Sequence, residues 1–245
     1  MLCSANRGEL MNREKETTRR QFVSFSFHRV LPEWRRLPLG EREEQRRELA
    51  ETIHKWCQPD NMRVLTYSLV GMRGDVDLML WRICYSLGCL QEMASDVRRT
   101  RMAGYMETRY SYLSMTRRSE YLINEHEEHP LLRGVVRPGG ARYLLVYPLV
   151  RTRSWYMLPF EDRQRAVREL LKLYRDFPNT HSHVTYSFGL DSQEFMVAIE
   201  TDHPDEVVER SMRIREAEAS MYVQSDTPVF TCVQGSVEDV LERIG

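Results

Sequence analysis

The sequence predicts an α+β fold, a dimeric α+β barrel made of two ferredoxin-like units within one chain. Strands of alternating apolar residues and amphipathic helices occur twice in the order β-α-β-β-α-β, the ferredoxin-like order. The two passages also share a Gly and a short acidic turn before a mostly buried strand, at 70–83 ("VGMRGDVDLMLWRI") and 188–201 ("FGLDSQEFMVAIET"). Such a repeat indicates duplication of one unit, and two sheets with helices on one face each can cover their other faces by packing together.

The first ferredoxin-like unit is expected at residues 21–121. Its opening strand, residues 21–31, alternates apolar and polar side chains and places Phe25 and Phe27 on one face. A helix is expected over residues 40–57, where apolar side chains recur at helical spacing. The rest of this unit is expected to consist of strands at 62–71 and 76–86, a helix at 87–102 and a strand at 106–117.

The second unit is expected at residues 141–245, after a linker at 122–140 that is rich in turn-forming residues. Residues 1–20 are polar and charged and are expected to form a flexible N-terminal segment. Helical spacing places Leu170 and Tyr174 on one apolar helix face of the second unit. Its expected elements are a strand at 141–150, a helix at 160–177, strands at 181–190 and 194–202, a helix at 203–219, a strand at 220–235 and a helix at 236–245.

Composition excludes several classes of function. The chain has 245 residues, of which 42% are hydrophobic and 29% are charged, as in an ordinary globular protein. A formal net charge of −1 provides no basic field for nucleic acid, and no apolar run reaches the length of a membrane span. The five cysteines form no CxxC pair, so reduced thiols in a cytoplasmic protein are expected. Neither nucleic acid nor membrane is therefore an expected partner.

Two pairs of histidines are candidates for metal binding. His181 and His183 lie on one face of an expected strand, because strand side chains repeat every two residues, and both could reach one metal or a haem. No third ligand follows at a defined spacing, so surface or partner-packed imidazoles are the alternative. His126 and His129 lie in the expected linker, where a solvated polar turn is favoured over a chelate.

The segment 147–156 ("YPLVRTRSWY") ends an expected strand with a phenol, a proline and two arginines. Arg151 and Arg153 could clamp a carboxylate through paired hydrogen bonds, and an ordinary basic loop is the alternative. The chain contains no P-loop, no GxGxxG motif and no GxSxG motif. Spacing and periodicity alone therefore predict an α+β barrel that could hold an internal pocket.

Six segments, taken in order, resemble the chlorite dismutase-like haem proteins, a family that includes the coproheme decarboxylases. The resemblance covers about residues 20–244. It is carried by "PEWRRLP", "GMRGDVDLMLW", "YSYLSMTRRSEY", "YPLVRTRSWYMLPFEDRQ", "YSFGLDSQEF" and "VQGSVEDVLERI". The resemblance implies a pair of ferredoxin-like units, which agrees with the pattern, together with a haem in the C-terminal unit. It also implies a homo-oligomer, mostly a pentamer in this family.

The resemblance also implies which residues flank a haem iron. The family's ligand is a His near the end of a helix, and the matching position is Leu170 or Glu169, depending on the direction of alignment. The chain thus resembles a divergent member that lacks the expected proximal His. The distal residue is Arg in chlorite dismutases and Gln in coproheme decarboxylases, and it matches Ser182. Strand alternation then turns Ser182 toward the pocket and His181 and His183 away from it.

Three further positions match the family. Tyr147 matches the redox-active tyrosine of the coproheme decarboxylases, Arg151 matches their lysine, and Ser220 matches a serine near the tetrapyrrole propionates. The resemblance implies haem or iron coproporphyrin as cofactor, and a haem-binding oxidoreductase with peroxidase-like or coproheme-related activity. In that function Tyr147 and Ser182 would be catalytic. Because the iron ligand is unknown, a non-catalytic tetrapyrrole carrier or sensor and a haem-free oligomeric scaffold stay open as alternatives.

Overall fold

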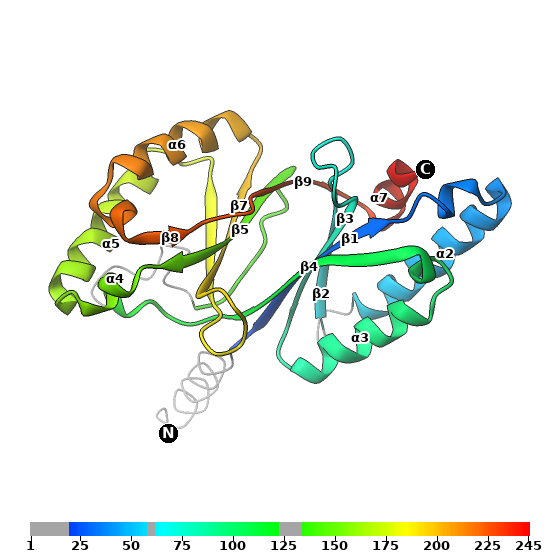
Figure 1. Cartoon of the computed structure of the whole chain (residues 1–245), viewed down its shortest axis with the longest axis horizontal. Helices are drawn as coiled ribbons and strands as arrows, with labels where there is room; N and C mark the ends of the chain where they lie inside the picture. Colours follow the sequence, from blue (N-terminus) through cyan, green and yellow to red (C-terminus); the bar gives the residue numbers. More distant parts are fainter. Residues whose placement is uncertain (1–19, 58–61, 123–133) are drawn as a thin grey trace, which may run out of the picture.

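The computed structural model of the chain describes residues 20–57, 62–122 and 134–245 (Figure 1). The expected N-terminal segment 1–20 lies almost wholly outside these ranges, and so do His126 and His129 of the expected linker. Within the described ranges, none of the helices combines the length and the apolar character that crossing a membrane requires.

The elements of the first half occur in the order β-α-β-β-α-β that the hydrophobic pattern predicts. They are β1 (Phe22–Val30), α2 (Leu39–Trp56), β2 (Met62–Ser68), β3 (Leu78–Cys84), α3 (Leu87–Arg99) and β4 (Met106–Met115). Short 3-10 helices lie at Trp34–Arg36, Met102–Tyr105 and Glu120–Leu122. The side chain of Ser86 caps α3 by accepting a hydrogen bond from the Gly88 N–H, which satisfies one free donor of the first turn.

The second half repeats this order with an added helix after its first strand, a divided last strand and an added C-terminal helix. Its elements are β5 (Tyr143–Arg151), α4 (Arg153–Met157), α5 (Phe160–Arg175), β6 (His181–Tyr186), β7 (Phe195–Thr201), α6 (Pro204–Glu216), β8 (Val223–Ser225), β9 (Phe230–Gly235) and α7 (Val237–Ile244). The expectation of one continuous strand over 220–235 is wrong, because a 3-10 helix at Glu218–Tyr222 and two separate strands occupy this segment. The interruption contains the cis bond Thr227-Pro228, and proline has no N–H to donate to a strand ladder.

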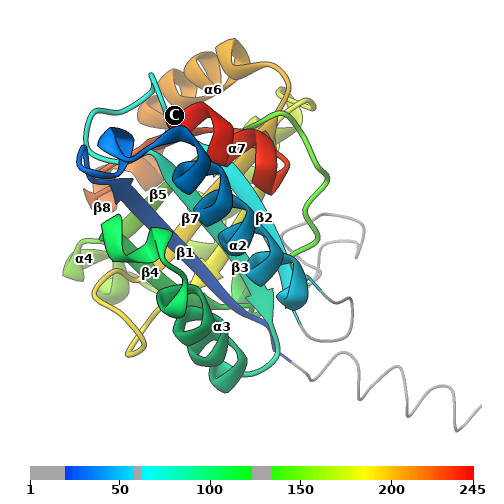
Figure 2. The same cartoon turned by 90° about the vertical axis from the view of Figure 1, so that its right-hand side faces the viewer.

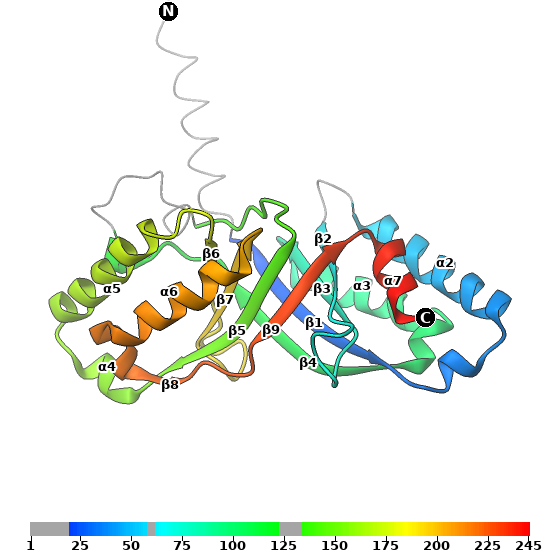
Figure 3. The same cartoon turned by 90° about the horizontal axis from the view of Figure 1, so that it is seen from above.

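The strands close into a barrel. The first unit has the strand order β4-β1-β3-β2, and the second has the equivalent order β9-β5-β7-β6. Pairing of β2 with β9 joins the two sheets along one edge, and pairing of Met115 in β4 with Tyr186 in β6 joins them along the other. Figure 3 shows the strands in the middle and a helical layer on each outer side. This arrangement confirms the predicted barrel of two ferredoxin-like units.

One hydrophobic core fills the space between the two sheets. Phe27 of β1 stacks on Phe230 of β9 with ring centroids 3.9 Å apart, and Phe25 stacks on Trp81 of β3 at 5.5 Å. Each of these four rings is at most 1% exposed. Burial of aromatic rings from both halves in one cluster stabilises the units against separation.

A second core lies between the first sheet and its helices, and the C-terminal helix belongs to it. Trp34 and Leu49 are buried there together with Val240, Leu241 and Ile244 of α7. Figure 2 shows α7 beside α2, although residues 237–244 follow the last strand of the other unit. The space between sheet and helices is therefore filled in the first unit by a helix that the second unit contributes.

Candidate functional site

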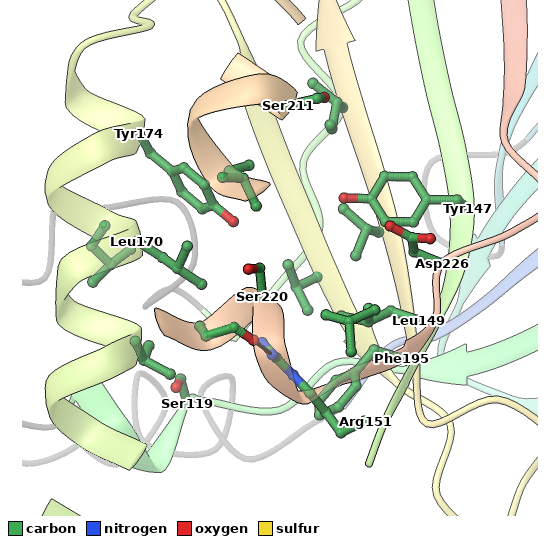
Figure 4. A pocket seen from close by; sticks show the side chains of 18 of the residues that line it. Ser119, Tyr147, Leu149, Arg151, Leu170, Tyr174, Phe195, Ser211, Ser220 and Asp226 are labelled. Carbon is green, nitrogen blue, oxygen red and sulfur yellow. Dashed lines mark hydrogen bonds between the residues drawn. The ribbon is translucent and has the colours of Figure 1, made fainter. Parts of the chain in front are cut away.

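The corresponding space in the second unit contains a cavity of about 330 Å³ between the sheet and helices α5 and α6 (Figure 4). This volume is within the usual range for small-molecule sites. Its wall is mostly apolar. The apolar side chains come from β5, β6, β7, α5 and α6, and they include Leu145, Leu149, Val184, Val197, Ile199, Val167, Leu170, Leu171 and Ile214. Such a wall suits a ligand with large apolar faces.

Strand β5 places its polar groups in this cavity through the two-residue repeat of strand side chains. Leu145, Tyr147 and Leu149 face the cavity, whereas Leu144 and Val146 face the core between the sheets. Burial raises the pKa of the Tyr147 hydroxyl. This hydroxyl has no hydrogen-bond partner within the described part of the chain, so it is free to interact with a ligand.

Arg151 carries a buried positive charge at the cavity wall. It is 9% exposed, and its Nη1 donates a hydrogen bond to the Ala219 carbonyl at 2.5 Å. Its guanidinium carbon lies 4.6 Å from the centroid of the Trp155 ring, which is a cation–π contact. Among the described residues no carboxylate pairs with it, and burial lowers its pKa. A buried guanidinium of this kind is a binding group for a ligand carboxylate.

The clamp considered for Arg151 and Arg153 is not formed in the structure. Arg153 begins α4, is exposed, and does not line the cavity. The backbone N–H of Arg151 donates to Glu194 Oε2 at 2.7 Å, and the Tyr156 hydroxyl donates to the same oxygen at 2.6 Å. These two hydrogen bonds hold the end of β5 and helix α4 against the residue that precedes β7.

Two more of the candidate residues line the cavity, and one does not. Leu170, which is 9% exposed, and Ser220 both line it. The Ser220 hydroxyl donates to the Arg215 carbonyl at 2.8 Å, and Arg215 pairs with Asp226 at 2.5 Å on the same wall. Glu169 is exposed on the outer side of α5 and is absent from the cavity wall.

Ser182 lies on the same face of β6 as Val184 and Tyr186, which line the cavity, but Ser182 itself does not reach the cavity. Its hydroxyl accepts a hydrogen bond from Arg210 Nη2 at 2.6 Å. The guanidinium of Arg210, from α6, therefore lies against the Ser182 hydroxyl.

The two histidines of β6 take separate roles. His181 is exposed, and His183 faces the core between the sheets, where its Nε2 donates to Glu200 Oε2 at 2.7 Å. Among residues 20–57, 62–122 and 134–245, no histidine lines the cavity, and no three His, Cys, Asp or Glu side chains gather as a metal site. A metal held by His181 and His183 together therefore has no support in the described structure.

Two residues of the site were not among the predicted ones. Tyr174 lines the cavity from α5, and Arg210 packs over its ring with the guanidinium carbon 4.0 Å from the ring centroid. Helical spacing places Tyr174 on the same face as Leu170, so the sequence contains the signal for Tyr174. Nothing local in the sequence indicates that Arg210 is buried.

Comparison with known proteins identifies the family. The family model described as chlorite dismutase matches residues 42–235, which is most of the chain. The chain belongs to the chlorite dismutase family. Its lack of a cavity-lining histidine in the described residues is a feature of this member of the family.

Relatives in sequence and in structure agree with this assignment. A coproheme decarboxylase from Mycolicibacterium smegmatis is 30% identical over 179 residues, which cover 73% of this chain and 75% of the relative. A chlorite dismutase structure from Candidatus Nitrospira defluvii superposes with a TM-score of 0.83 at 19% identity, over 95% of this chain and 99% of the other. A heme-binding protein from Thermus thermophilus superposes with the same score of 0.83 at 21% identity, over 92% and 95% of the two chains. At these identities the two structures support the fold.

Proposed function

We propose that this member of the chlorite dismutase family binds haem or iron coproporphyrin in the cavity of its second unit and acts as a haem-dependent oxidoreductase, peroxidase-like or coproheme-related. The observation that carries the proposal is the buried guanidinium of Arg151, which pairs with no carboxylate of the described residues, at the wall of a mostly apolar cavity. Haem and coproporphyrin combine a large apolar ring with carboxylates, which is the chemistry that these groups complement. The names of the relatives, coproheme decarboxylase and heme-binding protein, support the same ligand class.

The proposal assigns a role to each group of the wall. Arg151 would bind a ligand carboxylate, and the nearby Ser220 hydroxyl would contribute a weaker polar contact. Leu149 and Val197 from the sheet and Leu170 from α5 would pack on the two faces of the ring and exclude water.

Tyr147 would be the catalytic residue. An iron tetrapyrrole supplies one-electron oxidation chemistry when it is bound. Because burial raises the pKa of Tyr147, the residue is a neutral phenol near pH 7, which can give up an electron and a proton together. Asp226 lies close to Tyr147 in Figure 4, and it is held there by its ion pair with Arg215. Ser182 would act indirectly, by holding Arg210 in place.

Titration with haem and with iron coproporphyrin, followed by the Soret absorbance, tests the binding. We expect saturable binding of at least one of them to the purified chain. The Arg151→Gln variant should bind at least roughly tenfold more weakly, because a ligand carboxylate loses its charged partner. Arg153→Gln is the matched control and should bind as the wild type does. Equal affinity of the two variants would reject Arg151 as the carboxylate-binding group.

One observation favours a non-catalytic role as the second candidate. No histidine lines the cavity in the described part of the chain, so the usual histidine-supported activation of peroxide has no structural basis here. A tetrapyrrole carrier or sensor would bind the ligand but show no peroxide-dependent turnover. Turnover that falls in Tyr147→Phe while binding is kept would support the oxidoreductase instead.

We also propose that the chain forms a homo-oligomer, a pentamer as the family resemblance implies. We propose the cytoplasm as its location. Two exposed apolar side chains on α6 support a contact surface between copies of the chain. Val208 is 59% exposed and Met212 is 60% exposed. The buried free thiols of Cys84 and Cys232 suit a reducing compartment. Mass photometry of the purified chain would test the subunit count, and a monomer would contradict it.

A further inference from the structure

Two of the side chains that helix α5 presents to the cavity, Leu170 and Tyr174, differ in their ability to bind a metal. Leu170 has no atom that can coordinate iron. Tyr174, one helical turn later on the same face, also lines the cavity, and Figure 4 shows its hydroxyl directed into the space. This hydroxyl has no hydrogen-bond partner among the described residues. A phenol oxygen that is free and faces a ligand site is a potential donor atom to a metal.

The surroundings of Tyr174 carry a positive charge that no acid neutralises among the described residues. Arg210 is 1% exposed, and its guanidinium carbon lies 4.0 Å from the centroid of the Tyr174 ring. Its nitrogens donate to the hydroxyls of Thr180, at 2.9 Å, and Ser182, at 2.6 Å. Its Nε has no partner, and within the described ranges no carboxylate forms an ion pair with it.

A buried charge without a counter-ion is costly, so an anion beside it is favoured. The negative group that Tyr174 can supply is its own phenolate. A guanidinium over the ring stabilises the electron-rich phenolate more than the phenol. Tyr147 lies on the opposite wall, on β5, and its raised pKa keeps it protonated. The two phenols of the cavity thus differ in their surroundings, because the Arg210 guanidinium lies over the ring of Tyr174.

We propose that Tyr174, whose hydroxyl faces the cavity beside the buried guanidinium of Arg210, would ligate the iron of a bound tetrapyrrole as a phenolate, at a site where the described residues supply no histidine. The inference rests on the proposed function. On coordination the Tyr174 phenol would lose its O–H proton to solvent and its oxygen would bind the iron, with no change of oxidation state. Phenolate is an established type of haem ligand. Because one proton is released, the affinity for iron porphyrin should rise with pH while that for the metal-free porphyrin should not.

The test compares ferric coproporphyrin with metal-free coproporphyrin, on the wild type and on two tyrosine variants. We expect the wild-type ferric complex to show phenolate vibrations in resonance Raman spectra. Tyr174→Phe should abolish these vibrations and weaken ferric coproporphyrin binding by at least roughly tenfold. Tyr174→Phe should still bind metal-free coproporphyrin as the wild type does, which shows that its pocket is folded. Tyr147→Phe, which removes the phenol on the opposite wall, should keep the phenolate vibrations.

The outcomes separate this inference from the proposed function. If the wild type binds both porphyrins but shows no phenolate signature, or keeps it in Tyr174→Phe, the ligand assignment is overturned and the pocket assignment stands. Loss of the signature in Tyr147→Phe alone would assign the iron to the other wall. If the wild type binds neither porphyrin, both proposals fail.

Arg210 is a positioning residue in this proposal, and its variants give a second readout. In Arg210→Met the phenolate signature should appear at higher pH than in the wild type, because the compensating charge is gone. Arg210→Lys should restore part of the shift. A signature with the same pH dependence in all three proteins would show that Arg210 does not stabilise the phenolate.

Discussion

The imidazole of His183 donates a hydrogen bond to the carboxylate of Glu200 at 2.7 Å, in the core between the two sheets. The side chains are only 9% and 1% exposed. The same carboxylate accepts backbone N–H groups from Gly139, at 2.9 Å, and Gly140, at 3.0 Å. Glu200 therefore ties β6, β7 and the segment before β5 together. The Trp81 ring of the first unit packs 5.6 Å from the imidazole, so the cluster also joins the two units.

Removal of this imidazole should destabilise the protein. We expect His183→Ala to lower the free energy of unfolding by about 3 kcal/mol, because it leaves a buried carboxylate without its charged or hydrogen-bonding side-chain partner. Urea denaturation monitored by tryptophan fluorescence measures the change. His181→Ala is the matched control on the same strand, and since His181 is exposed it should change the free energy by less than about 0.5 kcal/mol. Equal effects of the two variants would contradict the structural role of His183.

Glu200 should make the stability depend on acid pH. Burial is the largest influence on its pKa and raises it, but the hydrogen bonds from His183, Gly139 and Gly140 outweigh burial, and the pKa lies below its usual value of 4.5. The carboxylate thus stabilises the fold above about pH 4.5, and this contribution is lost as the pH falls through the lowered pKa.

The Glu200→Gln variant tests this dependence. It should be less stable than the wild type near pH 7, and the difference should shrink as the pH falls through the lowered pKa of Glu200, where the wild-type carboxylate becomes protonated. Urea midpoints at several pH values give the comparison. A difference that stays constant over this range would show that Glu200 does not titrate as the structure implies.

A histidine at position 170 should restore a strong iron ligand. Leu170 lines the cavity from the helix, so Leu170→His would direct an imidazole at a bound tetrapyrrole. We expect the affinity for iron porphyrin to increase roughly tenfold, about 1.4 kcal/mol, and the Soret band to shift. Glu169→His, on the exposed side of the same helix, is the control and should change neither. No effect of Leu170→His would mean that the ligand does not lie against this part of α5.

Shortening a buried side chain of the C-terminal helix should lower the stability of the N-terminal unit. Leu241 of α7 is 1% exposed in the core around α2, so Leu241→Ala should cost about 3 kcal/mol. Amide hydrogen exchange should accelerate in α2 and α7 and stay unchanged in α5. Glu242→Ala, at an exposed position of the same helix, should have little effect. Faster exchange confined to α5 would contradict the packing of α7 on the first unit.

Most of the architecture could be predicted because it depends on local periodicity. The repeat of two in β5 places Tyr147 on the cavity side, and the repeat of nearly four in α5 places Leu170 and Tyr174 on one face. The same parity turns His183 away from the cavity. Periodicity predicted one strand over the segment 220–235, and this prediction was wrong. A 3-10 helix occupies its start, and the rest forms two strands separated by a stretch that contains Pro228.

The charges of the site were harder to predict. Arg210 follows Ser182 by 28 positions and lies on another element, so no spacing rule connects the two. Its sequence context is an ordinary charged helix, yet the structure buries it completely between β6 and Tyr174. Only the packing of α6 on the sheet brings the guanidinium to the place in front of Ser182.

By itself, the sequence determined the order of most strands and helices, the duplicated unit and the side of each strand on which a residue lies. These properties follow from the alternation of apolar and polar residues over a few positions. Only the tertiary structure decided that the first unit is filled, with α7 and Trp34 in its core, while the second keeps a cavity. It also decided that Arg151 and Arg210 are buried without acids beside them in the described chain. Those outcomes depend on contacts between residues far apart in the chain, about which a local pattern carries no information.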